Sequence, residues 1–290
     1  MSQAEKDAVE DRLSRTVEAY HEAALLYAAV KLGLAEKMGA GSRTAEDLAQ
    51  TLGLSAPHLA RFLRGLCIIG ICEERAGGSF ALTPFGRSLT PESKLAQKVQ
   101  IVVEQYWQPW TYLAETLQNG VPAFAQTFGT TVFDWRRDHP EQGALFASYL
   151  AKQSQAETAA VRAALGVSET DRFVEIGAAD VSAALPSDAD LYLLNGVLQN
   201  FDDAGALAIL RNCRAAMRDG ARLVIVERLL PERAADDAAA IMLDLHLMTI
   251  YGGRARTLAE FEDLLSAARL ELSRMTPMRS GLAVVECLTT

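Results

Sequence analysis

Long apolar runs are missing from this 290-residue sequence, and no stretch approaches the ~20 apolar residues that a membrane-spanning helix needs. The charged N-terminus, Met1 to Asp7, has no apolar core of the kind found in a secretory signal peptide. The four cysteines form no CxxC pair and lie in apolar runs, which is typical of buried reduced thiols. These absences argue against a membrane protein and against a disulfide-stabilised protein. They predict a cytoplasmic location with no membrane partner.

A basic excess is also missing, since the formal net charge is -9. Nucleic-acid-binding domains usually carry a strong positive charge, so we expect no nucleic acid as the main partner. A small neutral or cationic ligand, or another protein, fits this charge better. Half of the positions are apolar, which is enough for two domains that each have a core of their own.

A glycine-rich turn is missing where one is expected. The residues from Arg172 to Asp180 begin like a nucleotide-binding strand and turn, but Ala178 and Ala179 stand where glycines are needed. The next strand, Ala189 to Val197, follows almost at once, and only Val181 to Leu185 remains for a helix. A nucleotide-type site also needs an acidic residue on the following strand. The sequence therefore predicts no cofactor site in this region.

The N-terminal part has the pattern of a winged helix. Apolar residues recur at helical spacing from Arg12 to Met38. Thr44 opens a short helix with a capping pattern, and Pro57 lies in the first turn of another. Glu73 to Leu82 has two glycines at its centre and reads as a β-hairpin.

A winged helix has two interpretations of different class. One is DNA binding through the second helix, which carries His58, Arg61 and Arg64. The rest of that helix is mostly apolar, which leaves little polar surface for base edges. Apolar surface of this kind favours burial against another chain, so we expect a homodimer.

Aromatic residues are few, but about half of them fall between positions 106 and 149. Core packing between helices explains such a cluster, and so does a pocket for a flat ligand. We predict that four of them line a ligand pocket: Trp107, Trp110, Phe124 and Phe128.

The C-terminal half alternates strands and helices. Asp190 to Val197 reads as a strand, and the mostly apolar run Ala221 to Glu227 as a strand of a parallel sheet buried on both faces. A helix from Ala204 to Met217, which Asp202 caps, lies between them. A helix from Ala238 to Tyr251 follows. The end of the chain predicts a capped helix from Thr257 to Ala268 and an antiparallel pair, Leu270 to Met275 with Leu282 to Leu288.

This arrangement resembles the small-molecule O-methyltransferases that use S-adenosylmethionine. The residues that carry the resemblance are Gly39 to Leu89, Phe128 to Phe146, Leu198 to Asp203 (Leu-Gln-Asn-Phe-Asp-Asp, where the family has Leu-His-Asp-Trp-Asp-Asp), Ala221 to Glu227 and Gly253 to Glu260. The resemblance implies an α/β protein with a mainly-α winged-helix dimerisation domain over 1–100, linker helices over 101–165 and a truncated Rossmann-like domain over 166–290.

Two departures from the family pattern bear on function. The family has two further strand–helix units, roughly sixty residues, after its first strand, and they carry the glycine turn and the ribose-binding acid. Without them, the first strand is expected to become the sheet edge beside the family's fourth strand. The family's catalytic histidine is here Gln199, and an amide cannot take a proton at neutral pH. We therefore expect no S-adenosylmethionine cofactor and no metal, and the hypothesis is that methyl transfer has been lost.

The function predicted on this basis is a homodimeric enzyme that acts on a small aromatic or polyketide-like molecule without S-adenosylmethionine, by cyclisation, rearrangement, dehydration or elimination. The alternatives are a residual S-adenosylmethionine-dependent O-methyltransferase, a non-catalytic dimer partner and a winged-helix regulator. The candidate catalytic residues are Glu227, His246, Asp244 and Gln199, and Asn195 and Met248 join the four aromatic residues as candidate substrate contacts.

Overall fold

A computed structural model of the chain describes residues 2–165, 172–178, 181 and 184–289. The chain divides into two compact units, the first made of residues 1–107 with 144–149 and the second of residues 108–143 with 150–290. Within the short segment from Val181 to Leu185, where a helix had to fit, residues 182 and 183 lie outside the described residues.

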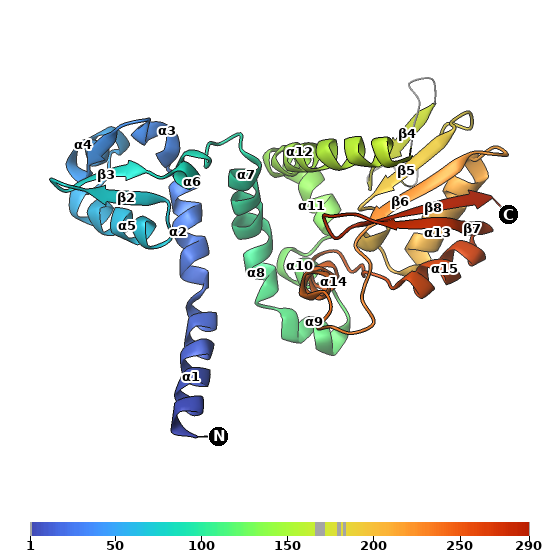
Figure 1. The fold of residues 1–290 in the computed structure, drawn as a ribbon, viewed down its shortest axis with the longest axis horizontal. Helices are drawn as coiled ribbons and strands as arrows, with labels where there is room; N and C mark the ends of the chain where they lie inside the picture. The colour runs from blue at the N-terminus through green and yellow to red at the C-terminus, as the bar shows by residue number, and fades with distance from the viewer. Residues whose placement is uncertain (1, 166–171, 179–180, 182–183, 290) are drawn as a thin grey trace. The chain divides into compact units, whose positions relative to one another are not determined.

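The first unit contains the predicted winged helix (Figure 1). Its three-stranded sheet has the order β1-β3-β2, and all neighbours are antiparallel. The hairpin turns at two glycines with positive φ, Gly77 and Gly78, as the sequence predicted. Its elements are α1 (Gln3–Glu18), α2 (Tyr20–Lys31), α3 (Leu34–Met38), β1 (Ser42–Thr44), α4 (Ala45–Leu52), α5 (Ala56–Ile68), β2 (Cys72–Arg75), β3 (Ser79–Leu82), α6 (Pro84–Arg87), α7 (Lys94–Ile101) and a π-helical turn, η1 (Val102–Tyr106).

The stretch from Arg12 to Met38 differs from the single helical segment that its periodicity predicts. It spans three helices, because α1 ends at Glu18 and a break at Gly33 separates α2 from α3. Gly33 has a φ of 61°, a backbone conformation that residues with a Cβ seldom adopt. Apolar spacing continues across both breaks, so periodicity alone does not reveal them.

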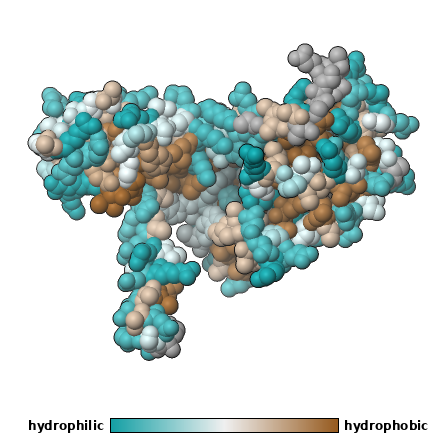
Figure 2. Space-filling model, in the orientation of Figure 1, coloured by the Kyte–Doolittle hydropathy of each residue, from teal (hydrophilic) through white to brown (hydrophobic). Residues whose placement is uncertain are grey.

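Helix α1 buries none of its residues within the first unit. Val9, Leu13 and Val17 follow one another at a spacing of four and are 47%, 61% and 74% exposed. Residues four apart share one face of a helix, so these side chains form an uncovered apolar stripe. Figure 2 shows brown apolar surface among the helices of this unit.

The second unit is built on a five-stranded sheet in the order β4-β5-β6-β8-β7 (Figure 1). The strands β4 (Phe173–Ile176), β5 (Leu191–Asn195) and β6 (Arg222–Glu227) are parallel, and β7 (Leu270–Pro277) and β8 (Ala283–Thr289) complete the sheet as antiparallel strands. β4 is the edge strand and pairs directly with β5. This pairing was expected because the sequence lacks the family's two further strand–helix units.

Helices cover both faces of this sheet. On one face, Tyr192 and Leu194 pack with α13 (Asp203–Ala216) and α15 (Leu258–Ala267) in the main core. On the other face, Leu191 and Leu193 pack with Val161 of α12 (Pro140–Leu165). The buried run of β5 is therefore explained by a strand with helices on both sides. The remaining elements are α8 (Trp107–Trp110), α9 (Leu113–Asn119), α10 (Ala123–Phe128), α11 (Val132–Asp138), a 3-10 turn η2 (Leu198–Asn200) and α14 (Ala238–Ile250).

Among the described residues, no helix is both long and apolar enough to cross a membrane.

Candidate active site

The carboxyl ends of the three parallel strands meet at one edge of the sheet. Ile176 pairs with Leu194, and Asn195 pairs with Val226, so Asn195 and Glu227 at the ends of β5 and β6, and Gly177 directly after β4, lie at the same edge of the sheet. Ligands of open α/β sheets bind outside this edge. The sheet thus brings two of the predicted site residues, Asn195 and Glu227, to the place where the fold class puts its ligands.

The turn η2 carries Gln199 directly after this edge. It is entered through Gly196, which has a φ of 64°. The Gln199 amide folds back over that glycine, with Nε2 3.4 Å from where a Cβ would stand. Gln199 itself is only partly buried. The turn therefore offers a neutral amide at the carboxyl edge of the sheet.

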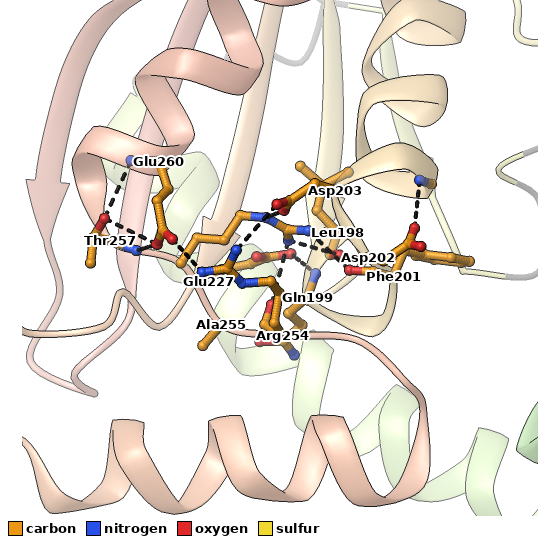
Figure 3. Close-up of polar contacts among 12 residues, drawn as sticks. Leu198, Gln199, Phe201, Asp202, Asp203, Glu227, Arg254, Ala255, Thr257 and Glu260 are labelled. Carbon is orange, nitrogen blue, oxygen red and sulfur yellow. Dashed lines mark hydrogen bonds and ion pairs between the residues drawn. The ribbon is translucent and has the colours of Figure 1, made fainter. Parts of the chain in front are cut away.

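Glu227 holds this turn through its carboxylate (Figure 3). Its side chain is 2% exposed, and its Oε1 accepts a hydrogen bond from the backbone N–H of Gln199 at 3.0 Å. Burial raises the pKa of Glu227 to about 7, against the opposing effect of the backbone hydrogen bonds that favour its charged form. The structure thus brings Glu227 and Gln199 together, with the carboxylate bonded to the backbone of the turn.

Arg256 fixes the same turn from another side. Its side chain is fully buried, with its guanidinium donating to the carbonyl oxygens of Leu198 at 3.2 Å and Phe201 at 2.9 Å. Its Nε donates to Oδ1 of Asp203 at 2.9 Å. One cation therefore ties both ends of the turn to the first residue of α13.

The loop that carries Arg256 also packs closely against the turn, backbone to backbone. A Cβ added at Gly253 would stand 2.2 Å from the carbonyl oxygen of Gln199 and 2.4 Å from the carbonyl carbon of Asn200. Asp244 of α14 holds the loop in place, because its Oδ1 accepts a hydrogen bond from the N–H of Ala255 at 2.8 Å. We call Glu227, Arg256, Gly253 and Asp244 together the turn clamp.

His246 lies on α14 in a second group of side chains. Nε1 of Trp110 donates to its Nδ1 at 3.3 Å, and the two rings stack with centroids 6.2 Å apart. An indole only donates, so Nδ1 is the acceptor and the proton of the neutral ring is on Nε2. Burial, with the charge of Arg136 as a smaller cause, lowers the pKa of His246 to about 4. The ring is therefore neutral at pH 7.

Stacked aromatic rings connect the turn with His246. Phe201, at the end of the turn, stacks on Phe133 with centroids 5.9 Å apart, and Phe133 contacts Tyr251 at 5.7 Å. Tyr251 in turn lies edge-on to His246 at 6.0 Å. Arg136 is buried and has its guanidinium 5.7 Å from the centre of the Tyr251 ring.

The predicted aromatic contacts separate into different groups. Phe124 and Phe128 pack against each other at 4.7 Å and both contact Trp135. Trp110 is with His246, whereas Trp107 belongs to the first unit and contacts Tyr20 there. Met248 lies on α14 and is partly buried. That these residues and Gln199 line one pocket remains a prediction.

Several residues of the site had no predicted role. Arg256 and Gly253 belong to a segment that the sequence marked as family-like, but nothing in the sequence indicated that they contact the Gln199 turn. Asp203 and Phe201 lie in the family-like segment Leu198 to Asp203, and Tyr251 ends the predicted helix from Ala238, but none of the three was given a role in the site.

The pKa values of Glu227 and His246 are shifted in opposite directions, and this difference allows a test of the site geometry. Glu227 has a raised pKa, so its contribution to stability is present below pH 4.5 and is lost as the pH rises to about 7. His246 has a lowered pKa, so stability is gained as the pH rises from about 4 to 6.5. In the wild type the two effects oppose each other.

Replacing one of the two groups should reveal the pH dependence of stability that the other contributes. The replacement is Gln, because it keeps a hydrogen-bond acceptor and does not titrate. Glu227→Gln should make stability rise between pH 4.5 and 6.5, and His246→Gln should make it fall, each by up to roughly 3 kcal/mol. Urea unfolding at a series of pH values measures both. Parallel profiles for the two variants would show that these pKa shifts are not present.

The fold and site define a Rossmann-like domain with a clamped turn at its carboxyl edge, joined to a winged-helix unit. Two family profiles match the chain, the O-methyltransferase domain over residues 159–270 and the O-methyltransferase dimerisation domain over residues 14–92. The chain is 31% identical over 311 positions to a phenazine O-methyltransferase, PhzM, of Lysobacter antibioticus, covering 90% of this chain and 91% of the relative. The chain therefore belongs to the family of O-methyltransferases with a dimerisation domain.

Two further similarities extend over most of the chain. A phenazine-1-carboxylate N-methyltransferase of Pseudomonas aeruginosa is 27% identical over 307 positions, with 89% of this chain and 92% of the relative covered. The solved structure of the mitomycin 7-O-methyltransferase MmcR matches with a TM-score of 0.91 at 25% identity, covering 100% of both chains. The alignment to the Lysobacter relative is longer than this whole chain, so that relative has residues that this chain lacks.

These findings correct the predicted function. The hypothesis that methyl transfer has been replaced by a cyclisation, rearrangement, dehydration or elimination without S-adenosylmethionine is contradicted, because relatives matched over nearly their full length are named methyltransferases. The hypothesis rested on a short connection between β4 and β5 and on Gln199. Missing residues change how a ligand is held, but they do not by themselves show that a reaction has been lost.

Proposed function

We propose that this chain is an S-adenosylmethionine-dependent methyltransferase that methylates a small aromatic molecule of natural-product biosynthesis. The observation that carries the proposal is the retained site: the Gln199 turn, held by Glu227 and Arg256, stands at the carboxyl edge of the sheet. The named activities of the relatives support it, since both O- and N-methyltransferases of aromatic compounds are among them.

The carboxyl ends of β4 and β5 provide part of a binding site for the methyl donor. Gly177 directly follows β4 and has no side chain, which lets a ligand approach the backbone. Asn195 ends the neighbouring strand β5, and its side-chain amide both donates and accepts hydrogen bonds. These two residues would hold the donor. When bound, S-adenosylmethionine supplies an electrophilic methyl group on a sulfonium.

The acceptor would lie among the aromatic side chains beyond the turn. The rings of Phe201, Phe133 and Tyr251 follow one another from the turn to His246 and Trp110. Such side chains bind flat molecules through their faces and edges. Gln199 would present a neutral donor and acceptor for a substituent of the ring.

In this arrangement the chain contributes orientation. The turn clamp fixes the backbone that carries Gln199, so the amide holds its position without reorganisation when the acceptor binds. A group held within a few tenths of an ångström of the productive geometry gains much of the rate that proximity supplies. Glu227 acts on this turn as a positioning residue, because its carboxylate contacts the backbone of Gln199 rather than solvent.

A homodimer belongs to the proposal. The apolar stripe Val9, Leu13 and Val17 of α1 is uncovered within the first unit, and the dimerisation-domain match begins inside it at residue 14 and includes Val17. Apolar surface of this kind is typical of permanent interfaces. We propose a second copy of the chain as its partner.

The experiment that tests the proposed function measures donor binding and methyl transfer on one sample. We expect saturable binding of S-adenosylmethionine in calorimetry, and transfer of label from methyl-labelled donor to members of a panel of hydroxyphenazines, hydroxynaphthoates and aminohydroxybenzoates. Light scattering of the same sample is expected to give the mass of a dimer. No binding at millimolar donor together with no labelled product would refute the proposed activity.

A further inference from the structure

Among the described residues around the Gln199 turn, none is available as a base that could take a proton from a methyl acceptor. The position that faces the carboxyl edge is an amide, which is neutral at every physiological pH and takes no proton. Glu227 lies behind the turn, 2% exposed, with its carboxylate on the N–H of Gln199. His246 accepts the indole proton of Trp110 on the one ring nitrogen that has a lone pair to offer.

The other charged groups around the turn are bound to one another. Asp202 caps α13 through the N–H of Gly205 at 2.8 Å, and Asp203 pairs with Arg256 at 2.9 Å and Arg254 at 3.1 Å. Glu260 pairs with Arg254 and closes a capping box at Thr257. Asp244 accepts from the backbone of Ala255. In the part of the chain that the structure describes, the groups facing the turn from β6, α13, α14 and the 252–260 segment all have such partners.

We infer that this chain methylates acceptors whose reacting oxygen is already ionised at neutral pH, that is, acidic phenols and related enolised hydroxyl groups. This inference rests on the proposed function and names its substrate class. The acceptor loses its proton to water before it binds, so the chain has only to bind and orient the anion.

The step then balances without a base. A lone pair of the ionised oxygen forms the new O–C bond, while the bond from the methyl carbon to the sulfonium sulfur breaks and its electron pair stays on sulfur. No proton moves in this step. Neutral donors beside the oxygen, such as the amide of Gln199, suit this chemistry, because a cation there would stabilise the attacking anion and slow it.

The test compares two acceptors of similar size and different acidity. 4-Methylphenol is the side chain of tyrosine, with a pKa of about 10, and 4-nitrophenol is far more acidic; an acidic and a less acidic hydroxynaphthoate form a second pair. We expect kcat/KM to rise about tenfold per pH unit up to the pKa of the acceptor itself, so that the apparent pKa differs between the members of each pair.

The variant Gln199→His supplies a base with a pKa near 6.5. It is expected to raise transfer to the less acidic acceptor, relative to transfer to the acidic one, by roughly 10²- to 10⁴-fold at pH 7. Gln199→Asn keeps an amide and is the matched control. Circular dichroism checks that each variant is folded, and if Gln199→His is not, the wild-type profiles alone decide.

Each outcome has one meaning. Transfer with an apparent pKa that is the same for both acceptors would show a base on the enzyme and overturn the inference, while leaving the proposed function standing. Equal rates for the two acceptors at pH 7 would overturn it as well. No transfer to any acceptor by the wild type or by Gln199→His, with no donor binding, would refute the proposed function itself.

Discussion

Gly253→Ala should lower methyl transfer at least a hundredfold. A methyl group at this position would stand 2.2 Å from the carbonyl oxygen of Gln199 and 2.7 Å from the backbone nitrogen of Phe201, so the turn itself has to move. Backbone atoms yield less easily than flexible side chains, and overpacking of this kind costs roughly 1–3 kcal/mol of stability. Turnover and urea unfolding measure the two effects.

Gly41→Ala is the matched control for this substitution. Gly41 has no heavy atom within 4 Å of an added Cβ, and its φ is not positive. The same chemical change there is expected to leave stability within about 0.5 kcal/mol and transfer unchanged. If Gly253→Ala behaves like Gly41→Ala, the contact between the 252–260 segment and the turn is not as close as the structure places it.

Arg256→Met should have the second large effect. Methionine fills a similar volume, but it removes the charged donor of the Phe201 carbonyl oxygen and leaves the Leu198 carbonyl oxygen with only the backbone N–H of Phe201. Buried acceptors that lose a charged partner in this way cost roughly 3 kcal/mol together. We expect that loss in the free energy of unfolding, and a fall in transfer because the turn is no longer fixed.

Arg254→Met tests whether the effect belongs to the clamp or to any arginine nearby. Arg254 also pairs with Asp203, but its side chain is 40% exposed and it reaches no carbonyl of the turn in the described contacts. Exposed ion pairs contribute about 1 kcal/mol or less. Equal losses for the two variants would mean that the buried hydrogen bonds of Arg256 do not hold the turn.

Much of the fold follows from local signals in the sequence. Thr257 opens α15 with the predicted capping box, Asp202 caps α13, and two glycines turn the hairpin between β2 and β3. The apolar run of β6 correctly indicated a parallel strand covered on both faces. Each of these features depends on residues within a few positions of one another.

The site was less predictable, because its contacts join distant segments. Gly253 and Gln199 are 54 positions apart, and the reason for a glycine there is visible only when the two backbones meet. Arg256 looked like part of a family segment, but its buried contacts with the turn come from tertiary packing. The hypothesis of lost methylation was wrong for a related reason: it counted the missing residues without knowing how the retained edge is arranged.

Amide hydrogen exchange at Gln199 tests the central claim, that the turn at the carboxyl edge is held rigid from both sides. Its N–H donates to the buried carboxylate of Glu227, so exchange in the wild type is predicted to be as slow as in the core strand β5. In Gly253→Ala it is predicted to speed up, while exchange in β5 stays slow. Fast exchange at Gln199 in the wild type, or exchange unchanged in Gly253→Ala, would contradict the account.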